Sequence, residues 1–140
     1  MPTKTEWYLE KRIILSQAHG KITLDEFTLT GKLLDEYRQE GTAPIHWILD
    51  AREVEKPILD LGLARKTFQI LKHEDFGWTI VLVAKPNRLM TFLASTVAQT
   101  LGIRYRLLHE MDEALAFLRE RDPTLNNEHD KREDSDLARH

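Results

Sequence analysis

The stretch Ile45-His46-Trp47-Ile48-Leu49-Asp50 decides the fold of this chain. It follows Pro44, is mostly apolar at consecutive positions and ends at a carboxylate. A strand with this pattern has both of its faces covered, as in the centre of a sheet that is flanked by helices. We therefore expect a central strand here, with the rest of the chain packed around it.

Length, charge and composition limit the class of protein. A chain of 140 residues is long enough for one domain with its own core. The net charge of -3 gives no general attraction to nucleic acid, which usually requires a clustered basic excess. The chain has no cysteine, no apolar signal segment and no apolar run as long as a membrane span. We expect a cytoplasmic protein.

The residues before the central strand predict a hairpin and a helix. Two short apolar runs, 7–9 and 13–15, are separated by a polar, turn-prone segment. Thr23 and Glu26 have the spacing of a capping box, and the helix that follows is expected to end near Gly41.

After the central strand, residues 51–56 are expected to form a loop that runs to Pro57. Proline suits the first position of a helix, so a helix is predicted from there to about residue 73. The most hydrophobic run in the chain, 77–84, predicts a second buried strand.

Asn87 is expected to cap a third long helix, whose apolar stripe is Leu89, Leu93, Val97 and Leu101. Apolar and basic residues alternate over 103–108, which indicates an edge strand, and a final helix is predicted over 111–121.

The predicted order of elements is ββαβαβαβα. Successive strand–helix–strand units give parallel neighbours, and the first hairpin adds an antiparallel strand. We predict a single α/β domain over residues 1–122, with a mixed, mostly parallel five-stranded sheet flanked by four helices. Residues 123–140 are polar and are expected to form a disordered tail.

Four short signals occur in order between Glu6 and Asp122. They are Gly20-Lys21-Ile22-Thr23, the strand end at Asp50, Gly77-Trp78, and Glu113-Ala114-Leu115-Ala116-Phe117-Leu118. In their order and spacing they resemble the STAS-like family, in particular the anti-sigma-factor-antagonist-like subgroup. That family shares its core layout with the CRAL-TRIO lipid-transfer domains. The resemblance implies a regulatory, non-enzymatic module that binds a partner protein.

One departure from the family pattern concerns its switch. Well-understood members carry a serine that becomes phosphorylated, in an Asp-Ser-Ser-Gly-Leu segment. The matching stretch here is Asp60-Leu61-Gly62-Leu63, which has no hydroxyl group. We expect the phosphorylation switch to be absent at this place.

Polar residues near the ends of the predicted strands are candidates for a binding site. Ligands of open sheets of this type bind at the carboxyl ends of the strands, where the strand order reverses, and helix amino termini there receive anions. The polar candidates are Asp50, Arg52, Asp60, Lys85, Asn87, Arg88 and His109. The alternative interpretation is that these residues cap helices and brace loops.

The sequence indicates neither a catalytic group nor a metal site. His46 and Asp50 share a strand face, but no nucleophile is tied to them, so His46 is interpreted as a buried, hydrogen-bonded residue. The histidines lack the spacing of metal ligands, and no glycine-rich loop indicates a nucleotide. We expect no cofactor.

Met90, Phe92 and Phe117 lie off the predicted helix stripes. They indicate an apolar ligand cavity or a subunit contact, unless the stripes are simply wide. The function that we expect is a regulatory module that binds a protein, and the alternative is a carrier or sensor of a small apolar or lipid-like ligand. An enclosed apolar cavity would favour the second, and a filled core with an exposed apolar patch the first. A homodimer is possible through the edge strand or the third helix.

Overall fold

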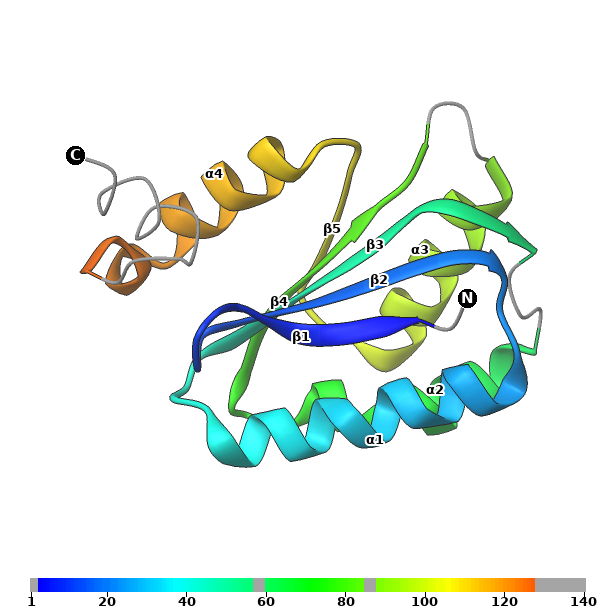
Figure 1. The fold of residues 1–140 in the computed structure, drawn as a ribbon, viewed down its shortest axis with the longest axis horizontal. Coiled ribbons are helices and arrows are strands. Elements are labelled where there is room, and N and C mark those ends of the chain that lie inside the picture. The colour runs from blue at the N-terminus through cyan, green and yellow to red at the C-terminus, as the bar shows by residue number, and fades with distance from the viewer. Residues whose placement is uncertain (1–2, 57–59, 85–87, 128–140) are drawn as a thin grey trace.

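The computed structural model describes residues 3–56, 60–84 and 88–127, which form one five-stranded sheet with four α-helices (Figure 1). The strands are β1 (Lys4–Leu9), β2 (Ile13–Lys21), β3 (Ile45–Lys56), β4 (Phe76–Leu82) and β5 (Tyr105–Leu108). The helices are α1 (Leu24–Glu40), α2 (Leu61–Phe68), α3 (Arg88–Leu101) and α4 (Met111–Arg121). Two 3₁₀ helices follow α2 and α4, at Gln69–Lys72 (η1) and Pro123–Asn127 (η2).

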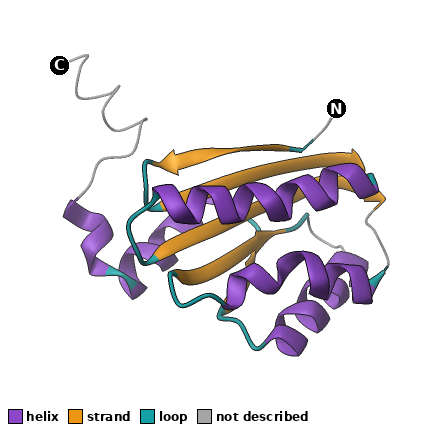
Figure 2. Cartoon of the chain, turned by 90° about the horizontal axis from the view of Figure 1, so that it is seen from below, coloured by secondary structure: helices purple, strands orange, loops and turns teal. Residues whose placement is uncertain are grey.

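The sheet has the order β1-β2-β3-β4-β5, with β1 antiparallel to β2 and all other neighbours parallel. Because each crossover adds its strand on the same side of the previous one, α1, α2 and α3 all lie on one face (Figures 1 and 2). Helix α4 follows the last strand and turns back across the opposite face. The predicted element order, mixed sheet and edge position of β5 are confirmed.

Strand β3 is buried on both faces, as its apolar run predicts. Ile45 and Ile48 are fully buried, and Trp47 is 2% exposed. The expected loop over residues 51–56 is wrong, because β3 continues to Lys56. Its extension pairs with β2 and buries Ala51 and Val54 on the α1–α3 face.

Helix α1 has the predicted ends, since the Thr23 side chain accepts from the Glu26 N–H and Gly41 is the C-cap. The Glu26 carboxylate, however, accepts from the backbone and hydroxyl of Thr3 rather than completing a capping box. Helix α2 begins at Leu61 with Asp60 as its cap, and Pro57, the expected first position of this helix, lies outside the described residues.

The buried side of α3 differs from the predicted stripe. Met90, Ala98 and Leu101 are buried, whereas Leu89 is 48% exposed. Met90 packs with Val81 on β4, so it belongs to the core side of the helix. The prediction that Met90 lies off this stripe, and Leu89 on it, is wrong.

The domain continues beyond the expected boundary at Asp122. Leu125 in η2 is only 1% exposed and joins the core that α4 covers. The first part of the predicted tail is therefore folded, and residues 128–140 lie outside the described ranges.

Candidate functional site

An apolar cavity of about 150 Å³ lies between the sheet and helices α1, α2 and α3. The three helices and strands β2, β3, β4 and β5 all contribute residues to its wall. Its lining includes Trp47, Ala64, Phe68, Val81, Met90 and Ala98. Natural cores have few voids of this size, which makes the cavity the first candidate for a binding site.

Small side chains on both walls create the cavity. Ala18 and Ala51 face it from the sheet, and Ala64, Ala94 and Ala98 face it from the helices. The methyl groups of these alanines are too short to fill the space between the sheet and the helices. Helices α1 and α2 also pack directly together, since a Cβ on Gly31 would lie 2.7 Å from the Thr67 Cγ2.

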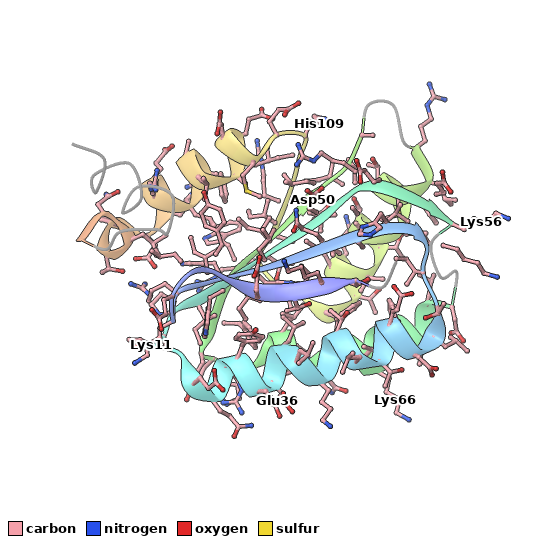
Figure 3. The ribbon with its side chains drawn as sticks, in the orientation of Figure 1. Lys11, Glu36, Asp50, Lys56, Lys66 and His109 are labelled. Carbon is pink, nitrogen blue, oxygen red and sulfur yellow. The ribbon has the colours of Figure 1, made fainter. Side chains whose placement is uncertain are left out.

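The cavity wall carries no charged side chain among the described residues. Glu36 on α1 and Lys66 on α2 point away from the sheet (Figure 3). Leu61, at the start of α2, is the one exposed residue in the described lining and is 36% exposed, and several other lining residues are partly exposed. The interior therefore has the polarity of a core while remaining connected to solvent.

The predicted polar residues Asp50, Arg52 and His109 lie on the opposite face of the sheet. Arg52 donates to both Asp50 carboxylate oxygens at 2.9 Å and reaches Glu110 at the start of α4 at 3.5 Å. Burial alone would raise the pKa of Asp50, but the hydrogen bonds and charge of Arg52 hold it below its ordinary value. The His109 Nδ1 lies 2.9 Å from the Val83 carbonyl oxygen. These contacts match the interpretation as loop braces.

The structure does not gather the other candidates into one site. Asp60 caps α2, and Arg88 is exposed at the first turn of α3. Lys85 and Asn87 lie outside the described residues. Because the sheet order is sequential, the expected crevice at a reversal of strand order does not exist among the described strands, and that expectation is wrong.

Of the three apolar candidates, only Met90 lines the cavity. Phe92 is 62% exposed on the outer side of α3. Phe117 packs edge-on against Trp78, with ring centroids 4.9 Å apart, on the face covered by α4.

A buried polar network, which the sequence analysis did not predict, joins residues from an early and a late part of the chain. The Arg12 Nη2 donates to an Asp122 carboxylate oxygen at 2.8 Å, and the same oxygen lies 2.9 Å from the His46 Nε2. The Trp78 N–H donates to the His46 Nδ1 at 2.9 Å. Because the Nδ1 accepts a hydrogen bond, the neutral ring carries its proton on Nε2. The Nε2–H group then donates a hydrogen bond to the Asp122 carboxylate. The expectation of a buried, hydrogen-bonded His46 is confirmed.

Burial and hydrogen bonding shift the pKa values of His46 and Asp122 in this network. Burial lowers the pKa of His46, and the hydrogen bond to Asp122 only partly opposes this. Burial acts in the opposite sense on Asp122, but hydrogen bonds from Thr124 and His46 and the charge of Arg12 hold its pKa below the ordinary value. A neutral histidine and an ionised aspartate paired with Arg12 form a stable structural arrangement.

No protein-family model matches the chain, and no curated protein matches it in sequence. Among solved structures, it is similar to an uncharacterized protein of the DUF3478 family with a SpoIIAA-like fold, from Shewanella loihica. The TM-score is 0.60, and the match covers 83% of this chain and 91% of that chain at 14% sequence identity. The chain has a SpoIIAA-like, or STAS-like, fold.

The resemblance in fold that the four sequence signals indicated is thus confirmed. Within this STAS-like fold, the described residues contain no group of three His, Asp or Glu side chains placed to hold a metal ion. None of the described helices has the length and apolar character needed to cross a membrane. The site itself offers an apolar wall with no charged side chain among the described lining residues.

Proposed function

We propose that this STAS-like chain is a non-enzymatic binding protein that carries or senses a small apolar ligand. The observation that supports it is the apolar cavity of about 150 Å³ beneath α1–α3. Engineered cavities of about this volume stay dry and bind benzene-sized molecules. The cavity gives the carrier or sensor function priority over the regulatory module that the family resemblance implied.

Energetics supports the same function. The wall of the cavity is almost entirely apolar and is connected to solvent, so apolar surface is in contact with water when no ligand is bound. A ligand that fills the space restores the missing contacts and removes its own apolar surface from water. Binding should therefore raise the stability of the folded chain.

The test is a titration of the full chain with toluene, followed by NMR and by thermal unfolding. We expect saturable binding and a higher melting temperature. Ala98→Leu should abolish both effects, because Ala98 lines the cavity. Ala116→Leu, at an exposed position on α4, is the matched control and should bind toluene like the wild type. Absence of saturable binding, or equal binding by both variants, would contradict the proposal.

A second candidate is the regulatory protein-binding module. Leu89 and Phe92 favour it, since they are 48% and 62% exposed and lie one turn apart on α3. Native mass spectrometry of the protein from its own cells tests this function. A second protein chain that is lost in Phe92→Ser would support it, and two copies of this chain would indicate a homodimer instead. A lone chain in both samples would argue against this module.

A further inference from the structure

The cavity wall contains four residues with hydroxyl groups, and three of these groups have partners. The Thr30 hydroxyl donates to the Glu26 carbonyl oxygen at 2.9 Å, and the Thr3 hydroxyl donates to the Glu26 carboxylate at 3.1 Å. The Tyr105 hydroxyl is hydrogen-bonded to Ser95. The fourth residue is Thr79 on β4, whose hydroxyl has no hydrogen-bond partner within the described part of the chain.

Thr79 is a buried residue in the wall of the cavity. Thr79 is 5% exposed, so almost all of its side chain is out of contact with bulk solvent. Every fully enclosed polar side-chain atom of the described residues nevertheless has a hydrogen-bond partner. The unpartnered Thr79 hydroxyl is therefore not fully enclosed, and the cavity is the open space that this residue lines.

The strand holds this hydroxyl in place. Thr79 pairs with Trp47 on β3 and with Tyr105 on β5, and its N–H donates to the Arg104 carbonyl oxygen at 2.9 Å. A β-branched side chain on a central strand has little rotational freedom. The cavity thus presents one fixed hydroxyl that can both donate and accept a hydrogen bond.

The surroundings of Thr79 restrict the ligand. A charged molecule would have to lose its hydration without a partner, because no described lining residue is charged. A purely apolar molecule would leave the hydroxyl without a hydrogen bond. A single water molecule would need two to four polar partners, and the wall offers one free hydroxyl.

We propose that the cavity selects a small, uncharged, mainly apolar molecule with one hydrogen-bonding group, and that the Thr79 hydroxyl binds this group. The inference rests on the proposed function and names its ligand class. A ring-sized alcohol, phenol or ketone meets the description. Thr79 thereby acts as the residue that determines specificity within an otherwise apolar site.

The experiment compares p-cresol with toluene, which share a ring and a methyl group and differ in one hydroxyl. Dissociation constants for both probes are measured on the full chain and on Thr79→Val, which keeps the shape and removes the hydroxyl. We expect Thr79→Val to weaken p-cresol binding about three- to tenfold, the value of one net hydrogen bond, without weakening toluene binding. Thr79→Ser, which restores a hydroxyl, should recover the preference for p-cresol.

Thr30→Val is the matched control, because Thr30 also lines the cavity but its hydroxyl is already bonded to helix α1. Its ratio of p-cresol to toluene affinity should equal that of the wild type. If Thr79→Val leaves the ratio unchanged while both probes bind, the role of Thr79 is overturned and the binding function stands. If neither probe binds the wild type, the proposed function itself fails, and this inference fails with it.

Discussion

The two faces of the sheet are filled in different ways. On the face under α4, large aliphatic residues such as Ile48, Ile80 and Leu118 are fully buried and pack into one core cluster. That face also encloses the ion pair of Arg12 and Asp122. On the face under α1–α3, opposing alanines leave a cavity of about 150 Å³.

The two faces also differ in how their polar groups are bonded and in how completely the space is filled. Under α4, Asp122 accepts hydrogen bonds from Arg12 and Thr124, so every strong polar group in the network is satisfied. Under α1–α3, Thr79 lines the cavity. A packed, fully bonded face holds the strands in place, and the other face carries the cavity on which the proposed binding function rests.

The largest effect is expected from Asp122→Ala on the packed face. It would remove the Asp122 carboxylate from the Arg12 guanidinium, whose side chain is 4% exposed. The free energy of unfolding should fall by about 3–5 kcal/mol, as measured by denaturant unfolding. Lys4→Ala, which removes an exposed pair with Glu6, is the control and should change it by less than about 1 kcal/mol. Equal effects would show that the buried network does not stabilise this face.

Gly77→Ala tests how tightly the packed face surrounds His46. A Cβ at position 77 would lie 2.4 Å from the His46 Cε1, so the buried ring must move. We expect a loss of about 2–3 kcal/mol in denaturant unfolding. Gly62→Ala in α2 is the control, because its nearest neighbour would be 3.4 Å away and alanine favours a helix. A stable Gly77→Ala variant would mean that the ring has room to shift.

The same enlargement on both faces gives the most direct comparison. Ala114→Leu, at a fully buried position of α4, should destabilise the chain by about 1–2 kcal/mol through overpacking. Ala98→Leu extends into the cavity and should be neutral or stabilising. Thermal and denaturant unfolding of the two variants measure the difference. Equal destabilisation would contradict the contrast between the faces.

The smallest effect concerns pH and His46. Burial lowers its folded-state pKa below the ordinary 6.5, so the folded chain favours the neutral ring. The stability this contributes is fully present above the unfolded value and is lost as the pH falls from there toward the folded value. The free energy of unfolding should decrease below about pH 6.5, by at most about 1.4 kcal/mol per pH unit from this group. In His46→Gln the free energy of unfolding should depend less on pH. An unchanged slope would show that His46 does not cause the pH dependence.

The element order and the central strand could be predicted from local sequence patterns. The apolar run of β3, the alternation in β5 and the signals at Thr23 and Gly41 are local patterns with a local physical cause. In β3 and β5 they indicate which residues are buried, and in α1 they indicate the ends of the helix. They failed where a boundary depended on distant contacts, as at Leu125, which is buried only because α4 and the sheet lie beside it.

The cavity and the buried network depend on contacts between segments that are far apart in the sequence. The local pattern places Ala51 in a loop and Ala98 off the apolar stripe of the third helix, whereas the packed layers place both in the wall of the cavity. The partners Arg12 and Asp122 are 110 positions apart in the chain. A residue's own neighbours in sequence determine its face, whereas the packed layers determine what it meets there and whether space remains.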